Sequence, residues 1–428
     1  MLSIPYNEGT ISSELLFPES VRWIVPKPFA SKEINNLAKA LSHPVNSKRL
    51  EEEGFEKPIL LFADDTRLPS PFVPELIKEL KAKTENVRLM IACGTHAIPK
   101  ETHAKSVLGD ELFSSYKGSL VYSSTRNPAS IYESIGRTSR GTEVELNKEL
   151  LECDFVLSTL CVRPHYFAGW EGGAKALLPG CSGYKTISQN HSYVIGNPDA
   201  RELGIKGNPV REDINEVSNL LEKKRGIRHR ILDFVPNLQD EPVEVKYGDP
   251  VEAHRELAEF GERICVVKTR PSSVVITVSE GSLGRSFYQA LKAATHSSNM
   301  LRLDREQKPT LILIGKMDQG IGSDTFRQEF ETYIGMNPEI VMDSLKKRVR
   351  EGSFNETLQK INRMMMYLPK VDFMVVSLDA PTELETMLER KNIFFSRDLD
   401  EALETLNAHF LQDVAIIPQG NATVPSIF

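Results

Sequence analysis

The residues with the greatest capacity for chemistry lie close together in residues 161–202. Two histidines and a lysine stand around a glycine-rich turn there: His165, Gly172, Gly173, Lys175 and His191. Glycine permits positive φ angles and lets backbone approach a ligand closely. A lysine beside such a turn can bind phosphate or act as a nucleophile, and an imidazole can bind a metal or transfer a proton. Each residue alone is more often an ordinary surface group, but their clustering favours a functional site.

Three apolar segments of strand length end directly before polar side chains. The segments are PILLFA, VRLMIAC and DFVLSTLCV, and the side chains that follow them are Asp64 and Arg67, then His96, then His165. In open α/β sheets the ligand lies beyond the carboxyl ends of the strands. A polar side chain after one strand is explained by capping of the next helix, whereas polar side chains after all three strands favour a single site. We therefore expect these residues to meet Lys175 and His191 in one site.

The elements that must position this site follow an alternating order. Short apolar segments alternate with amphipathic helices, which is typical of mostly parallel sheets with helices on both faces. The chain of 428 residues is too long for one compact core. We expect two α/β domains with the active site in the cleft between them: a catalytic and cofactor-binding domain over 1–268 and a smaller domain over 269–399. The tail, 400–428, is expected to return to the first domain.

Composition excludes several classes of protein. The net charge of −7 argues against a nucleic-acid partner, and the longest apolar runs are far too short to span a bilayer. The N-terminus lacks the basic and apolar regions of a secretory signal. Five cysteines without a CxxC pair argue against a disulfide framework or a zinc ribbon. These observations predict a cytoplasmic protein with no membrane or nucleic-acid partner.

Several chemistries remain open from the residues alone. His96, His165 and His191 could supply the three ligands of a catalytic zinc, but no HExxH or HxH spacing supports such a site. Lys175 could form a Schiff base with a carbonyl. The first apolar segment ends in ADDTR instead of the dinucleotide-binding GxGxxG, and GGAKALLPG lacks the spacing of a Walker A loop.

The order of five sequence blocks resembles the lactate racemase family of nickel-dependent 2-hydroxyacid racemases and epimerases. The blocks are ADDTR, CGTH, RPHYFAGWEGGAKALLPG, the NH at 190–191 and SFYQALK. They occur in the family's order and cover most of the chain. The resemblance implies that the protein is an isomerase acting on a small-molecule 2-hydroxy acid.

The resemblance also implies a cofactor and a role for each site residue. In the family, nickel is carried by a pincer nucleotide, pyridinium-3,5-bisthiocarboxylic acid mononucleotide, which separate accessory enzymes make. By resemblance, the nucleotide would be tethered to Lys175 beside Gly172 and Gly173, with His191 as the protein ligand to nickel. The catalytic pair would be His96 and His165. The implied substrate-binding residues are Asp64, Arg67, Tyr288, Gln289 and Lys292.

The implied mechanism is a reversible hydride transfer through a 2-keto acid, with one histidine as base and the other as acid. The sequence departs from the family in one respect: its only tryptophans are Trp23 and Trp170, so the second domain lacks the indole expected beside lactate. We therefore expect a larger substrate, such as a sugar acid. The alternatives are a family member with different hydride or lyase chemistry, and a cofactor-binding protein without turnover, against which the presence of both histidines argues.

Overall fold

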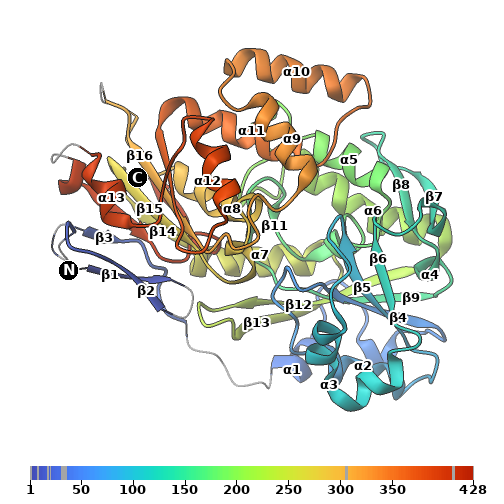
Figure 1. Ribbon diagram of the computed structural model, residues 1–428. Coiled ribbons are helices and arrows are strands. Elements are labelled where there is room, and N and C mark those ends of the chain that lie inside the picture. Colours follow the sequence, from blue (N-terminus) through green and yellow to red (C-terminus); the bar gives the residue numbers. More distant parts are fainter. Residues whose placement is uncertain are drawn as a thin grey trace. The chain divides into compact units, whose positions relative to one another are not determined.

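The computed structural model describes residues 2–6, 9–16, 19, 21–29, 36–303, 307–406 and 410–427. The chain forms two compact units (Figure 1). The larger unit contains residues 28–193 and 197–264, and the smaller unit contains residues 1–27, 194–196 and 265–428. Each unit is built around its own sheet of six strands.

The sheet of the larger unit has the strand order β13-β12-β9-β4-β5-β6, and only β12 and β13 pair antiparallel. Its strands are β4 (Pro58–Ala63), β5 (Arg88–Gly94), β6 (Val121–Ser124), β9 (Phe155–Thr159), β12 (Arg228–Pro236) and β13 (Pro242–Gly248). All residues of β4 and β9 are buried, which explains why both appear in the sequence as continuous apolar runs.

Helices pack on this sheet through its apolar residues. Residues from α1, α2 and α3 share one core cluster with alternate residues of the strands, including Leu60 and Phe62 of β4. The helices of this unit are α1 (Asn36–Ser42), α2 (Val73–Lys81), α3 (Glu101–Tyr116), α4 (Lys148–Leu151), α5 (Tyr184–Ser192), α6 (Pro209–Arg225) and α7 (Glu252–Cys265). Two small hairpins complete the unit: β7 (Tyr132–Arg137) with β8 (Glu143–Asn147), and β10 (Pro164–His165) with β11 (Gly169–Trp170).

The sheet of the smaller unit is parallel throughout, with the order β18-β17-β16-β15-β19-β3. Its strands are β3 (Val21–Trp23), β15 (Val274–Ser279), β16 (Thr310–Gly315), β17 (Asp372–Val376), β18 (Phe394–Ser396) and β19 (Val414–Ile417). Its helices are α8 (Phe287–Ser298), α9 (Asp324–Tyr333), α10 (Pro338–Arg350), α11 (Leu358–Tyr367), α12 (Thr382–Glu389) and α13 (Leu399–Glu404). Two further strand pairs are β1 (Leu2–Tyr6) with β2 (Gly9–Ser13), and β14 (Val266–Thr269) with β20 (Val424–Ile427).

The predicted fold class, α/β with mostly parallel sheets, is confirmed. The distribution of the chain between the units differs from the expected boundaries of 1–268 and 269–399. Residues 1–27 belong to the smaller unit, and so does the tail 400–428, which was expected to return to the first domain. The reason is a pairing between distant strands: β19 lies between β15 and β3, so both chain ends enter the same sheet.

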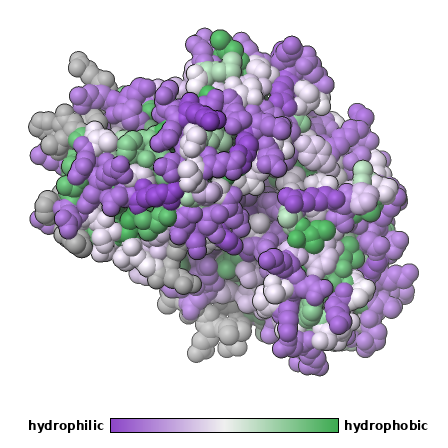
Figure 2. Space-filling view, in the orientation of Figure 1, coloured by the Kyte–Doolittle hydropathy of each residue, from purple (hydrophilic) through white to green (hydrophobic). Residues whose placement is uncertain are grey.

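Hydrophilic side chains cover most of the face seen in Figure 2, with small hydrophobic patches between them. Within the part of the chain that the structure describes, no helix combines the length and the apolar character needed to cross a membrane.

Candidate active site

The three strands that were predicted to end before polar side chains lie side by side. In the sheet of the larger unit, β4 has β9 on one side and β5 on the other, and all three strands run parallel. Their carboxyl ends therefore lie at one edge of the sheet. Asp64 follows β4 directly, His96 lies two residues after β5, and His165 lies in β10, a few residues after β9.

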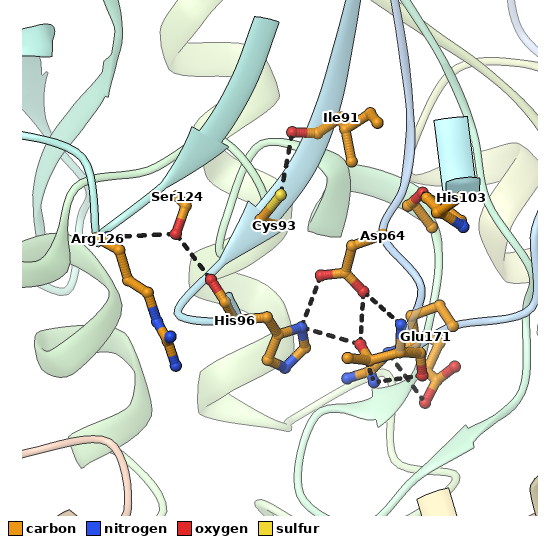
Figure 3. A network of polar contacts seen from close by, with 11 residues as sticks. Asp64, Ile91, Cys93, His96, His103, Ser124, Arg126 and Glu171 are labelled. Carbon is orange, nitrogen blue, oxygen red and sulfur yellow. Dashed lines mark hydrogen bonds and ion pairs between the residues drawn. The ribbon is translucent and has the colours of Figure 1, made fainter. Parts of the chain in front are cut away.

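Asp64 and His96 form the central polar contact of this edge (Figure 3). The distance from His96 Nδ1 to Asp64 Oδ2 is 2.8 Å, and the side chain of Asp64 is only 2% exposed. Thr66 donates its backbone N–H and its hydroxyl to the other carboxylate oxygen, over 2.9 and 2.5 Å. Since an ionised carboxylate only accepts hydrogen bonds, His96 carries a proton on Nδ1, and in the neutral ring Nε2 is the basic nitrogen.

The same contacts determine the charge of Asp64. Burial raises the pKa of this carboxyl, but the charge of His96, the hydrogen bond with it, the charge of Arg67 and the bond from Thr66 outweigh burial and lower the pKa to about 2. Asp64 is therefore ionised at neutral pH. The loop is also held from the next strand, because Ser124, the last residue of β6, donates its hydroxyl to the carbonyl of His96 over 2.7 Å (Figure 3).

His165 is held in a different way. The backbone N–H of Ala168 donates to His165 Nδ1 over 3.2 Å within the β10–β11 hairpin. A neutral imidazole that accepts at Nδ1 carries its proton on Nε2. The ring of Phe167 contacts both His165 and His191, at centroid distances of 4.5 and 5.0 Å, so one aromatic side chain spaces the two histidines.

His191 lies in the last turn of α5 and is partly exposed. Burial, with smaller contributions from the charges of Lys175 and His96, lowers the pKa of His191 to about 3, against the effect of the Ile187 carbonyl. His191 is therefore neutral at physiological pH. Lys175 and His96 are thus the two charged side chains that act on this ring.

Lys175 belongs to a short 3₁₀ turn, η4 (Gly173–Ala176). The chain that follows this turn reaches the edge of the sheet. The N–H of Gly94, the last residue of β5, donates to the carbonyl of Gly180 over 3.0 Å. This bond connects the segment after Lys175 with the strand that leads to His96. In the larger unit the structure thus groups six predicted residues: Asp64, Arg67, His96, His165, Lys175 and His191.

Gly172 and Gly173 have positive φ angles of 79° and 65°. A Cβ on Gly172 would lie 2.7 Å from Val162 Cγ2, and one on Gly173 would lie 2.9 Å from the His254 ring. The close approach predicted for these glycines is therefore to buried side chains of the protein itself. Contact of their backbone with a cofactor stays a prediction.

Arg211, Asp233 and His254 lie beneath this glycine turn, and the sequence reasoning missed all three. Arg211, on α6, is fully buried and donates to the carbonyls of Ala168, over 3.0 Å, and of Gly172, over 3.2 Å. It also donates to the carbonyl of Trp170. Burial lowers the pKa of Arg211 to about 9, against the opposing charges of Asp233 and Glu171. One arginine thus fixes three carbonyls of the segment that leads from His165 to Lys175.

Asp233, on β12, accepts the N–H of Gly173 over 2.6 Å and that of Leu160 over 2.8 Å. Burial raises the pKa of Asp233 to about 7, against the effects of these bonds and of Arg211. The Nε2 of His254, on α7, donates to the carbonyl of Glu171 over 2.8 Å. One sequence signal was available, because Asp233 interrupts the otherwise apolar segment ILDFVP and a buried carboxylate needs partners.

Arg67 was predicted to bind substrate. Its Nη1 donates to the carbonyl of Thr66 over 3.1 Å, and its Nε lies 3.8 Å from Glu171 Oε1. The ion pair is only partly exposed, since the side chains are 26% and 10% accessible. Arg67 thus retains exposed surface next to the Asp64–His96 pair.

The other three predicted residues lie on α8 of the smaller unit: Tyr288, Gln289 and Lys292. Tyr288 contacts two residues of α11 that the sequence analysis did not select. Gln359 Nε2 donates to the Tyr288 hydroxyl over 3.3 Å, and Lys360 Nζ lies 5.4 Å from the centre of the Tyr288 ring. The side chains of Lys292 and Lys360 are both buried. These α11 residues are further candidates for contact with a substrate.

A zinc site built from histidines is not supported. Across the described ranges, no group of three or more His, Cys, Asp and Glu side chains is arranged to hold a metal ion.

The fold and the site define a class: a two-unit α/β protein with paired histidines at the strand ends of one sheet and a lysine turn beside them. Residues 6–202 match the family model described as the lactate racemase N-terminal domain. Two proteins described as lactate racemase match along nearly the whole chain. The one from Thermoanaerobacterium thermosaccharolyticum is 26% identical, with 99% of this chain and 98% of the relative covered. The one from Lactiplantibacillus plantarum is 24% identical, with 98% of each covered.

Solved structures agree. The lactate racemase apoprotein from T. thermosaccharolyticum superposes with a TM-score of 0.85 at 25% identity, covering 99% of both chains. A protein from Thermotoga maritima has the same fold, with a TM-score of 0.68 at 17% identity, covering 89% of this chain and 96% of that one. Residues 6–202 thus match the N-terminal domain of the lactate racemase family, and the chain is similar to lactate racemases along nearly its whole length.

Proposed function

We propose that this protein is an isomerase that inverts carbon 2 of a 2-hydroxy acid with the help of a nickel-pincer nucleotide. The observation that carries the proposal is the pairing of His96 with buried Asp64 at the strand edge that also holds His165, Lys175 and His191. Similarity to lactate racemases along nearly the whole chain supports racemase activity.

The donor set suits such a cofactor. His191 is a single neutral imidazole with Lys175 nearby, and across the described ranges no larger ligand cluster accompanies it. One imidazole and one lysine are what a metal needs when a tethered nucleotide provides its other ligands. His191 would then bind the nickel, and Lys175 would hold the nucleotide, beside Gly172 and Gly173. When bound, this group would supply the acceptor and donor of the carbon-2 hydride.

The protein's own residues would manage the proton and the carboxylate. With Nδ1–H bound to Asp64, His96 Nε2 would take the hydroxyl proton, and Asp64 would stabilise the imidazolium that forms. In the return step His165, protonated on both nitrogens, would donate from Nε2 to the same oxygen and become neutral. Both this role and that of base toward the opposite enantiomer require a proton on Nδ1, so His165 must first release the Ala168 N–H. Arg67 or Lys292 would bind the carboxylate, and Tyr288 and Gln289 would contribute further polar contacts.

The substrate would be larger and more polar than lactate. Trp170 is fully buried and donates to the carbonyl of Leu203, and Trp23 lies on β3, so neither belongs to α8 or α11. The residues beside Tyr288 are instead Gln359 and Lys360. Amide and ammonium groups suit hydroxyl-rich or anionic chains, which supports a sugar acid as substrate.

The expected partners are the 2-hydroxy acid and the accessory enzymes that make the cofactor. All five cysteines are buried thiols, which supports a reducing, cytoplasmic location.

The test is co-expression with the cofactor-making enzymes, followed by intact mass and nickel analysis. Wild type should carry a mass adduct and bound nickel, and Lys175→Ala should lose both. Lys185→Ala is the matched control, because Lys185 is an exposed lysine paired with Glu143. The loaded protein is then assayed for inversion of aldonates, malate and aryl lactates. Absence of adduct and nickel from wild type would reject the cofactor, and conversion of these acids to any product other than the carbon-2 isomer would favour different hydride or lyase chemistry.

A further inference from the structure

Asn190, the residue before His191 on α5, is fully buried and has a defined orientation. Its Nδ2 donates to Asp213 Oδ2 over 2.8 Å and to the backbone carbonyl of Val210 over 3.1 Å. A carbonyl oxygen can only accept, so the amide nitrogen must face α6. The amide oxygen of Asn190 then faces His191, with 3.2 Å between Oδ1 and Nδ1.

Asp213, on α6, fixes the far end of this chain of contacts. The carboxylate is fully buried and accepts hydroxyl hydrogen bonds from Thr138, over 2.6 Å, and Thr142, over 2.9 Å, in addition to the one from Asn190. Burial of a carboxylate is costly unless donors satisfy it. Two donors from the turn between β7 and β8 and one from α5 make Asp213 a rigid anchor rather than a solvated helix residue.

The backbone carbonyl of Ile187, one helical turn earlier, also interacts with the His191 ring. The Nδ1 contact that fixes the tautomer is the one with the Asn190 amide oxygen, which can only accept, so the proton of the neutral ring lies on Nδ1. Nε2 is then the nitrogen with the lone pair, which is the one that can bind a metal.

We propose that Asn190 and Asp213 are positioning residues that hold His191 in its Nδ1-protonated form, with Nε2 directed to the metal. The proposal rests on the proposed function for the role of His191 as a metal ligand. Metal-binding histidines generally donate their second N–H to a fixed acceptor, which sets the tautomer and the ring orientation. Here an amide linked to a buried carboxylate is that acceptor, and the carboxylate on α6 acts through Asn190.

The first experiment needs no cofactor. In ¹⁵N-histidine spectra of the apoprotein, assigned with His191→Gln, wild type should show a protonated Nδ1 and an unprotonated Nε2 on His191. Asn190→Leu removes the side-chain acceptor and leaves only the Ile187 carbonyl, so signals of the second tautomer should appear. Gln189→Leu is the matched control. The Gln189 amide bonds to Glu143 N–H and to the Gly141 carbonyl, away from the His191 ring.

The second experiment follows nickel release from loaded protein. Asn190→Leu and Asp213→Leu should release nickel ~10-fold to 100-fold faster, the usual effect of losing such a partner. Asp213→Asn keeps an oxygen for Asn190 and should stay within about twofold of wild type, as should Gln189→Leu. If Asp213→Leu does not fold, Asn190→Leu alone decides.

A protonated Nε2 on His191 of wild type would overturn the proposal. So would an unchanged spectrum and release rate in Asn190→Leu. If wild type takes up no nickel, the proposed function fails, but the spectra still decide whether Asn190 sets the tautomer.

Discussion

His96 and Asp64 come from the ends of neighbouring strands and meet at 2.8 Å, and Asp64 is the buried partner. The contact joins the end of β4 to the loop after β5, so it can form only when these strands pair in register. It both sets the tautomer of His96 and supplies the negative charge that stabilises the ring after it takes a proton. Asp64, which was predicted to bind substrate, is therefore the residue that contacts and orients His96, the proposed base.

Replacing Asp64 with Asn should lower kcat of the loaded enzyme by ~10²- to 10⁴-fold, because a neutral amide does not stabilise the imidazolium. KM should change much less, since the effect arises when the proton moves. Asp65→Asn is the control, because Asp65 is the adjacent but exposed carboxylate. The nickel content of each variant should match that of wild type. An Asp64→Asn enzyme with undiminished kcat would contradict the role given to the pair.

The same carboxylate should make stability depend on pH in acid. The pKa of Asp64 falls from 3.8 to about 2 on folding, so the native state binds fewer protons than the unfolded state in this range. The shift is equivalent to about 2 kcal/mol of stability, present above pH 4 and lost as the pH falls toward 2. The free energy of unfolding of wild type and Asp64→Asn should be measured in urea at pH 6 and pH 3. The difference in unfolding free energy between wild type and Asp64→Asn should be ~1 kcal/mol smaller at pH 3 than at pH 6. The same difference at both pH values would contradict the lowered pKa of Asp64.

Gly173→Ala should destabilise the protein by at least ~2 kcal/mol, because φ is positive and the new methyl group would strike the His254 ring. The matched control is Gly118→Ala. A Cβ on Gly118 meets nothing within 4 Å, so its stability should change little. Thermal unfolding of both variants measures the difference in their stability. Equal stabilities would show that the turn before Lys175 relaxes away from α7.

Lys360→Met tests the preference for a polar substrate. Loss of the ammonium group beside Tyr288 should raise KM for sugar acids or dicarboxylates ~10-fold, the effect of one charged hydrogen bond, while KM for lactate stays unchanged. Lys370→Met serves as the control because Lys370 is exposed. A parallel rise in KM for lactate and the larger acids would place Lys360 outside the selective part of the site.

The polar residues at the strand ends could be predicted from the sequence because the pattern that marks them is local. A buried parallel strand is a continuous apolar run, and a polar residue at its end marks the edge where ligands bind. Asp64, His96 and His165 satisfy this pattern, and the order of β9, β4 and β5 in the sheet brings them together.

The supporting residues could not be predicted in the same way. Arg211 and Asp213 occur in a helix that looks like an ordinary charged surface helix, and only the packing of α6 buries them completely. Likewise, no local pattern states which sheet a short strand joins. The assignments of residues 1–27 and 400–428 depended on the pairing of β3 with β19.

That pairing has a consequence for the order in which the protein is made. Val21 of β3 pairs with Val414 of β19, so β3 cannot take its place in the sheet until β19, far later in the sequence, has been made. The larger unit, with all its residues between 28 and 264, can fold while synthesis continues. The strand ends that carry His96 and His165 would then be in place before the smaller unit gains its final strands. The step most exposed to misassembly would be the late pairing of β3 with β19 rather than formation of the site.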